Sequence, residues 1–338
     1  MRWLKYLCNV WIGIFVYTLI FLAVGEAVTF ILWVTKKLRR TDAGYGKYVL
    51  VKGIAVAALV AGFSIYGVVH AQHVYLQEYD VDIAKESPLG DGYKIALISD
   101  LHIGYSVDNE LMSQMVDVIN QQNPDLVVVA GDIIDNEFYA IAEPDKIAET
   151  LAGINAKDGV YGVYGNHEVA EKLVGGFTLY KPEKIEVQDD VSQMMDAANI
   201  NILEDEMVTI GDMQLVGRID GEKPNGQVLH EGEQRLSPEE WTAKLDKNKP
   251  IVFLDHEPDD LPDKAEAGVD VDLCGHTHDG QVFPGNLTIN LFWDNAYGFK
   301  KFGDMNSVVS SGVGVWGPAM RVGTNSEVVI VNVNFVGK

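Results

Sequence analysis

The chain has 338 residues, of which 47% are hydrophobic, 26 are Lys or Arg, 49 are Asp or Glu and 2 are Cys. This composition excludes a disordered tail, a collagen-like repeat and a small disulfide-stapled domain. Residues 1–70 contain 8 basic and 2 acidic residues, a net charge of +6, so the rest of the chain carries −29. A region this acidic would repel a phosphate backbone, which argues against nucleic acid as a partner.

Two apolar runs near the start of the chain are long enough to cross a membrane. The first, Val10–Val34, has Glu26 as its one charge, and the second, Tyr48–Val69, has Lys52 near its start. Because about 20 apolar residues span a hydrocarbon core as a helix, we predict two transmembrane helices within residues 1–70. The first run is too long for the apolar part of a cleaved signal peptide and lacks a small-x-small cleavage site. Glu26 is either a functional carboxylate, a partner that pairs the two helices, or a protonated group near the interface.

The basic residues around these runs predict an orientation. The segment between them is richer in positive charge than the tail before them, with Lys36, Lys37, Arg39, Arg40 and Lys47 against Arg2 and Lys5. Positively charged segments stay in the cytoplasm, so this connection is expected there. Two spans then place the large acidic region outside, as the extracytoplasmic part of an integral protein of the cell membrane.

After a turn-rich linker over 71–92, strands and helices alternate through a domain at 93–338. Short apolar runs predict strands at 93–99, 126–130, 160–164, 251–254, 271–274 and 328–335. Helices are predicted at 108–122, 143–155 and 189–199 and from Ser237, and a hairpin is predicted at Met207–Ile219. This alternation alone predicts an α/β domain.

Five of these predicted strands end in side chains that can bind metal ions. In chain order they are Asp100 and His102, Asp132 and Asp135, Asn166 and His167, His256, and His276 with His278. One histidine or one Gly-Asp pair at a strand end is more often structural than functional. In α/β folds, however, strand ends meet at one edge and form sites there. Together these residues supply enough oxygen and imidazole donors for two divalent ions.

The ordered series Asp-x-His, Gly-Asp-x-x-Asp, Gly-Asn-His-Glu, His and Gly-His-x-His resembles the calcineurin-like metallophosphoesterases. The series is complete and unsubstituted over residues 99–278. The segments Gly275–Val282 and Gly314–Arg321 resemble the membrane-associated YaeI/YkuE-like subgroup. The resemblance implies a four-layer α/β/β/α sandwich of two mixed sheets with helices outside, placed after the two-helix transmembrane hairpin.

The resemblance also implies a role for each matching residue. Two divalent ions, which could be Mn, Fe, Zn or Co, would share Asp132. One ion would be held by Asp100, His102 and His278, and the other by Asn166, His256 and His276. His167 would face the substrate as a general acid or a stabiliser of phosphoryl charge, and Asp135 would hold its ring.

The function implied is a membrane-anchored phosphohydrolase acting on phosphomonoesters, phosphodiesters or pyrophosphates. Its anchoring favours a phosphorylated substrate at the bilayer, such as a lipid-linked or nucleotide-linked envelope precursor. The alternative is a non-catalytic scaffold or sensor of the same fold, which would be expected to lack His167 or a bridging ligand. Outside the motifs, Arg321 is expected to contact a substrate phosphate or form a surface salt bridge, and Trp316 to line the pocket or pack.

Overall fold

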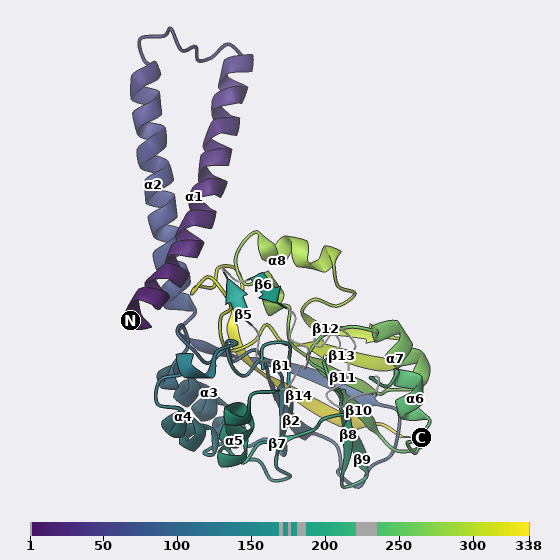
Figure 1. Cartoon of the computed structure of the whole chain (residues 1–338). Coiled ribbons are helices and arrows are strands. Elements are labelled where there is room, and N and C mark those ends of the chain that lie inside the picture. Colours follow the sequence, from purple (N-terminus) through teal and green to yellow (C-terminus); the bar gives the residue numbers. More distant parts are fainter. Residues whose placement is uncertain (1, 169–171, 175–176, 181–186, 221–234, 338) are drawn as a thin grey trace.

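The computed structural model describes residues 2–168, 172–174, 177–180, 187–220 and 235–337. Figure 1 shows a long helical hairpin that rises from one end of a domain built around two sheets. The hairpin consists of α1, Arg2–Val34, and α2, Tyr45–His70, and both helices are apolar and long enough to be candidate membrane spans. Most of their side chains are exposed, so they are not core helices of the domain. Glu26 Oε1 lies 2.5 Å from Lys52 Nζ and therefore pairs the two helices.

Two six-stranded sheets form the centre of the domain. The first has the order β1 (Val74–Ile83), β14 (Ser326–Phe335), β2 (Tyr93–Ile98), β3 (Leu126–Ala130), β4 (Val160–Val163) and β7 (Asn201–Ile202). The second has the order β12 (Gly298–Phe302), β13 (Met305–Val309), β11 (Val271–Cys274), β10 (Ile251–Leu254), β9 (Met213–Gly217) and β8 (Glu206–Ile210). Both sheets are mixed, because β2, β3 and β4 run parallel to one another while β14 is antiparallel to β2, and β10 and β11 run parallel while β12 is antiparallel to β13.

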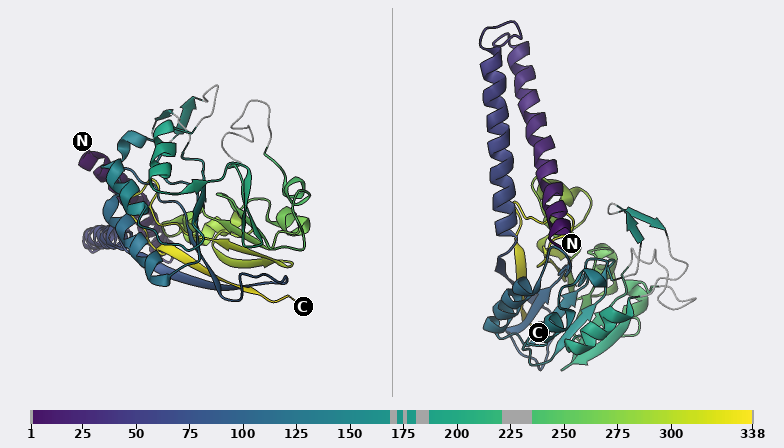
Figure 2. Two further views of the ribbon diagram at one scale, coloured as in Figure 1. Left: turned by 90° about the horizontal axis from the view of Figure 1, so that it is seen from below. Right: turned by 60° about the vertical axis from the view of Figure 1, so that its left-hand side comes forward.

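Helices cover the outer face of each sheet, which gives the four layers implied by the family resemblance (Figures 1 and 2). The first sheet is covered by α3 (Asn109–Gln122), α4 (Pro144–Leu151) and α5 (Asp189–Ala197), and the second by α6 (Pro238–Thr242) and α7 (Leu261–Ala267). The remaining elements are short: β5 (Lys172–Val174), β6 (Phe177–Tyr180), α8 (Gly285–Thr288), and the 3-10 turns η1 (Phe138–Ala140), η2 (His278–Gly280) and η3 (Ile289–Leu291).

Alternation along the strands explains why the layers form. In β2, Ile95 and Leu97 pack in the core between the sheets, whereas Ala96 and Ile98 pack under the outer helices. Successive side chains of a strand point to opposite faces, so a strand that is apolar throughout is buried on both. The continuous apolar runs at the sheet centres therefore require cover on both sides.

The structure contradicts the plain linker expected over 71–92. Val74–Ile83 forms β1, which pairs in parallel with β14 along its whole length, starting with Val74 opposite Ser326. The segment was missed because it lies at the edge of the sheet, where many of its side chains are polar and exposed. The domain sheet thus begins four residues after α2 ends at His70.

The base of the hairpin packs on the loop before β14. Tyr17 of α1 is buried against Met320 and Val322, and the carbonyl of Gly67 in α2 accepts a 3.0 Å hydrogen bond from the Arg321 amide. A Cβ atom on Gly67 would lie 2.7 Å from a Val322 methyl carbon, so the close approach requires glycine there. The hairpin and the domain are therefore held in a defined orientation.

Candidate metal centre

The predicted site residues follow strands that end at the same edge of each sheet. Asp100 and His102 follow β2, Asp132 follows β3, and Asn166 and His167 follow β4; His256 follows β10, and His276 and His278 follow β11. Five of them have left-handed backbone conformations, with φ of 51° at Asp100, 43° at His102, 51° at Asp132, 72° at His276 and 52° at His278. Such conformations are costly for residues other than glycine and concentrate at functional sites.

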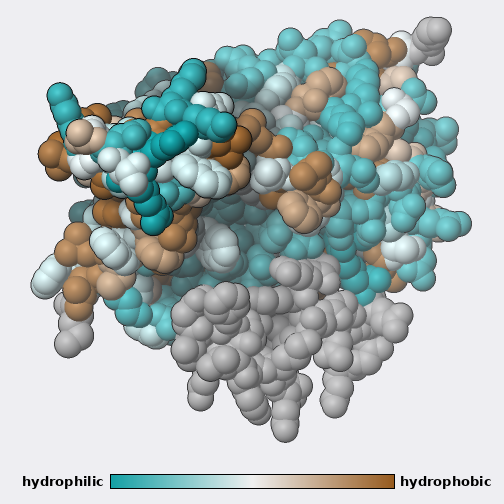
Figure 3. Space-filling view, turned by 90° about the horizontal axis from the view of Figure 1, so that it is seen from above, coloured by the Kyte–Doolittle hydropathy of each residue, from teal (hydrophilic) through white to brown (hydrophobic). Residues whose placement is uncertain are grey.

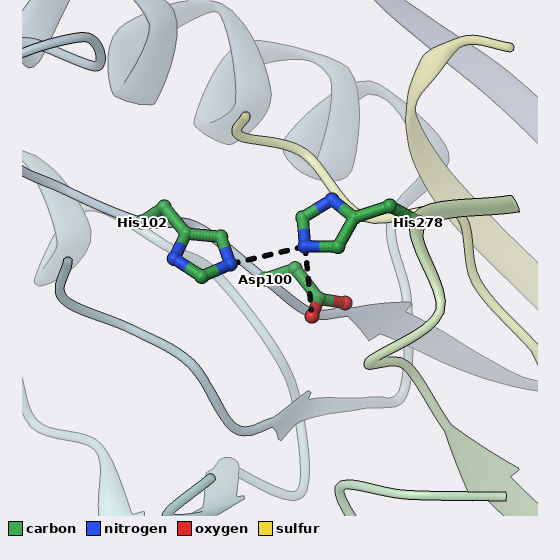
Figure 4. A group of neighbouring side chains, drawn as sticks. All are labelled: Asp100, His102 and His278. Carbon is green, nitrogen blue, oxygen red and sulfur yellow. Dashed lines mark hydrogen bonds and ion pairs between the residues drawn. The ribbon is translucent and has the colours of Figure 1, made fainter. Parts of the chain in front are cut away.

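The first group of potential ligands consists of Asp100, His102 and His278 (Figure 4). His102 Nε2 lies 3.0 Å from His278 Nε2, which is 3.5 Å from Asp100 Oδ1. All three side chains are buried and point toward one another. Asp100 and His102 follow β2 and His278 follows β11, and these two strands belong to different sheets. The group therefore joins the two halves of the sandwich.

The second group is formed by Asp132, His256 and His276, with Asn166 beside them. His256 Nε2 lies 3.2 Å from Asp132 Oδ2, 3.1 Å from His276 Nδ1 and 3.1 Å from Asn166 Oδ1. The same Asp132 oxygen is 3.6 Å from His102 Nε2 in the first group. Asp132 Oδ2 thus lies between the two groups.

Burial controls the protonation of the imidazoles. It holds the pKa of His102 and His278 well below the usual value and lowers the pKa of His276 to about 3. Burial also opposes charge on His256 and Asp132, but each stabilises the ionised form of the other, so the pKa of His256 is raised and that of Asp132 lowered. Neutral imidazole, the form that burial favours at His102, His276 and His278, is the form in which histidine binds a metal ion.

The donor set fits divalent cations. Two neutral imidazoles meet nitrogen to nitrogen at 3.0 Å, and only one of those nitrogens can donate a proton to the other. His102 Nδ1 is buried without a hydrogen-bond partner in the described parts of the chain. A cation bound between the two nitrogens would accept a lone pair from each of them and so remove the conflict. Mixed imidazole and carboxylate ligands suit transition-metal ions.

His167 and Asp135 lie at the border of this cluster. His167 Nδ1 is 3.8 Å from Asp135 Oδ1, which is also 3.9 Å from His102 Nδ1. The carboxylate is thus near the His167 ring but beyond hydrogen-bond distance of it. Burial and the charge of Asp132 raise the pKa of Asp135 to about 6. The His167 ring packs edge to face against His102 and against Trp316, which is half exposed at the edge of the site.

Glu168 supports the structure of the site, a role that was not predicted from the sequence. Its buried carboxylate accepts hydrogen bonds from the amides of Ile133 (2.6 Å), Gly165 (2.6 Å), Ile134 (3.1 Å) and Asp132 (3.2 Å). Burial and the nearby Asp132 raise its pKa to about 7. It joins the loops after β3 and β4, and its place at the end of the Gly-Asn-His-Glu motif was the available signal.

Arg321 is fully buried, so both expectations for it are wrong: it neither reaches a substrate nor forms a surface salt bridge. Its guanidinium donates to the carbonyls of Ser311 (2.6 Å) and Gly314 (2.7 Å), and Nη2 lies 3.4 Å from His278 Nδ1. Burial lowers its pKa to about 10. Arg321 therefore supports His278 and the loop after β13 from behind.

A second buried charge network lies behind His256. Lys264 Nζ is 2.5 Å from Asp255 Oδ2 and 2.7 Å from Asp272 Oδ1, and all three side chains are fully buried. Asp255 also pairs with Arg218 and Arg235, each at 3.0 Å. Although burial opposes charge on Lys264, the two carboxylates hold its pKa above the usual value. The network fixes the ends of β10 and β11, from which His256 and His276 project.

Comparison with known proteins gives one matching family. A family model described as calcineurin-like phosphoesterase matches residues 93–280, more than half of the chain. That range contains every residue of both ligand groups, together with Asp135, His167 and Glu168.

Similar relatives carry metallophosphoesterase names. An uncharacterized metallophosphoesterase of Helicobacter pylori is 27% identical over 259 residues, covering 75% of this chain and 60% of the relative. A transmembrane protein with metallophosphoesterase domain from Danio rerio is 25% identical over 351 residues, covering 97% of this chain and 73% of the relative, so that alignment includes the hairpin. The uncharacterized metallophosphoesterase YkuE of Bacillus subtilis is 29% identical over 242 residues, covering 68% and 74%. The chain thus spans about three fifths of the length of the Helicobacter relative.

Proposed function

The chain belongs to the calcineurin-like phosphoesterase family, and from that premise we propose that it is a membrane-anchored, metal-dependent phosphohydrolase that cleaves phosphoester or pyrophosphate bonds. The observation that carries the proposal is the position of Asp132. One of its oxygens lies 3.2 Å from His256 Nε2 and 3.6 Å from His102 Nε2, between two groups of potential ligands. Paired groups that share a carboxylate are suited to two ions.

The proposed ligands follow the two groups. Asp100, His102 and His278 would hold one divalent cation, and Asn166, His256 and His276 would hold the other, with Asp132 shared. Divalent cations bound there supply Lewis acidity, which neutralises phosphoryl charge and makes water nucleophilic at neutral pH. Mn, Fe, Zn and Co all suit such ligands.

The side chains outside the ligand groups position and protonate the substrate. The His167 backbone amide donates to Asp132 Oδ1 at 2.9 Å, which fixes His167 relative to the shared carboxylate. Its Nδ1 faces Asp135 and its Nε2 faces Asp132 at 4.0 Å. The Nε2 atom is therefore the one proposed to donate a proton to the leaving oxygen, while Asp135 lies on the Nδ1 side of the ring.

The hairpin is proposed to cross the cell membrane with residues 35–44 in the cytoplasm. This orientation follows the basic residues between the helices and leaves the domain outside. The base of the hairpin packs on the domain, so the anchor and the site form one unit. A substrate near the bilayer, lipid-linked or nucleotide-linked, fits such an arrangement.

Replacing His167 with alanine tests the catalytic role. Loss of a general acid lowers turnover of an alkyl phosphoester about 10²-fold to 10⁴-fold and that of a p-nitrophenyl ester much less, because p-nitrophenolate leaves without a proton. Metal affinity stays unchanged because His167 is not one of the proposed ligands. The measurement is hydrolysis of glycerol 2-phosphate and p-nitrophenyl phosphate by the full chain, with the metal content of each sample determined. His73→Ala is the matched control, because His73 is exposed in the short connection between α2 and β1. Metal-loaded wild-type chain that hydrolyses neither ester would favour the scaffold or sensor instead.

A further inference from the structure

The position of the hairpin relative to the domain defines a membrane level. A helix rises about 1.5 Å per residue and the hydrocarbon core is about 30 Å thick, so about 20 residues cross it. Counted from Val34, next to the basic connection, a span of that length ends near Ile14. Gly13 and Tyr17 lie at this level, and both contact Met320. The loop that carries Met320 and Val322 is therefore at the domain-side edge of the bilayer.

A second segment starts from this level. Val282 pairs with Val322 in a parallel bridge, and the Phe283 amide donates to the Val322 carbonyl at 2.7 Å. The chain then continues through α8 and η3 on the side of the domain from which the hairpin rises (Figure 1). Phe283 is thus the first residue of a segment that begins beside the membrane helices.

This segment exposes large apolar side chains. Leu291 is 79% and Phe292 77% exposed, and Leu287 and Phe283 are also exposed. We call these four residues the apolar ridge. Figure 3, which looks down on the hairpin side, shows hydrophobic residues around the hairpin and again on the domain beside it. Four large apolar side chains exposed within one short segment indicate an interaction surface.

The ridge leads directly to the proposed metal centre. Trp293, which follows Phe292, packs edge to face against His276 with ring centroids 5.3 Å apart. At the other end of the segment, Gln281 accepts a 2.8 Å hydrogen bond from the amide of Trp316, whose ring packs against His167. The segment therefore connects the membrane level with both sides of the site.

We propose that the apolar ridge inserts into the bilayer interface beside the hairpin, and that the adjacent site acts on phosphoesters of lipid headgroups in the same leaflet. Leucine and phenylalanine side chains of this exposure gain free energy on entering the headgroup and acyl boundary. The bilayer is the occupant because the segment that carries the ridge starts at Val282, which packs in the same cluster as Tyr17 of the membrane helix, and continues on the side of the domain from which the hairpin rises. The statement about the substrate rests on the proposed function, whereas insertion of the ridge requires only that the hairpin spans the membrane.

Depth measurement tests the insertion. In the full chain with Cys8→Ser, a nitroxide is attached to Leu291→Cys or to Val336→Cys, with Cys274 left in place because it is buried. Val336 is a matched control, half exposed and near the C-terminus, on the side of the domain away from the hairpin (Figure 1). In phosphatidylcholine–phosphatidylglycerol vesicles, the Leu291 label should be more accessible to oxygen than to a water-soluble nickel chelate, and the Val336 label the reverse. Equal accessibility of the two labels overturns insertion. Spin–spin broadening of the Leu291 label that disappears when unlabelled chain is added also overturns it, because this result means that a second copy of the chain covers the ridge.

Two substrates with the same leaving group test the lipid specificity. They are bis-p-nitrophenyl phosphate in solution and phosphatidyl-p-nitrophenol in the same vesicles. The double variant Leu291→Asp, Phe292→Asp should lose at least about tenfold in turnover of the lipid ester, since burying one such side chain is worth that much or more, and should keep its turnover of the soluble ester. Wild-type chain that cleaves only the soluble ester overturns the lipid substrate. Wild-type chain that cleaves neither contradicts the proposed function, while the label depths still decide the insertion.

Discussion

Asp132→Asn is expected to lower turnover of bis-p-nitrophenyl phosphate by about a thousandfold. Each proposed ion would lose a ligand, and with the ions the site would lose the several kcal/mol by which they stabilise the transition state. Asparagine keeps the size of the side chain and an oxygen that can still accept the His167 amide at Oδ1. The variant should therefore fold and fail in metal binding. The measurement is turnover together with the number of ions retained per chain.

A surface carboxylate provides the control for this variant. Asp117 is exposed on α3, so Asp117→Asn should retain both metal content and turnover. An Asp132→Asn chain that keeps two ions and full turnover would contradict the shared position of this carboxylate.

Lys264→Met is expected to lower the free energy of unfolding by about 3–5 kcal/mol, because removing one partner of a buried ion pair leaves the other charge uncompensated. Asp272 would lose its cation, while Asp255 would keep Arg218 and Arg235. Denaturant unfolding of the full chain in detergent, at a fixed metal concentration, measures the loss.

Two further variants separate charge from packing. Lys301 is exposed on β12, so Lys301→Met should leave the stability nearly unchanged. Adding Asp272→Asn to Lys264→Met removes the uncompensated carboxylate and should restore part of the stability. A double variant no more stable than Lys264→Met alone would contradict the electrostatic origin of the loss.

The sequence was sufficient to predict that the proposed ligands lie close together, because each of them has a local signature. Each proposed ligand follows a short apolar run, and strands aligned in a sheet bring such positions to one edge. The assignment of His102 and His278 to the same ligand group came from the family resemblance, and the two side chains do lie together. The alternation of apolar runs also predicted the core strands, because those are buried on both faces.

Features that depend on long-range packing could not be predicted in the same way. The partners of Asp255 lie at positions 218, 235 and 264, and nothing local to them indicates a common cluster. Glu168 acts through backbone amides, which every residue carries. Arg321 was expected at a substrate phosphate or in a surface salt bridge, yet it is buried and backbone carbonyls are its acceptors. Strand β1 was missed because an edge strand with many polar side chains resembles a linker.

Metal reconstitution of the full chain tests the proposed chemistry most directly. The chain is stripped with a chelator, refilled with Mn²⁺, Zn²⁺, Fe²⁺ or Co²⁺, and assayed with bis-p-nitrophenyl phosphate while bound metal is counted. We predict that turnover is absent in the stripped chain and returns as two ions bind per chain. Two ions bound per chain without any turnover, or turnover that persists in the stripped chain, would contradict a dinuclear phosphohydrolase.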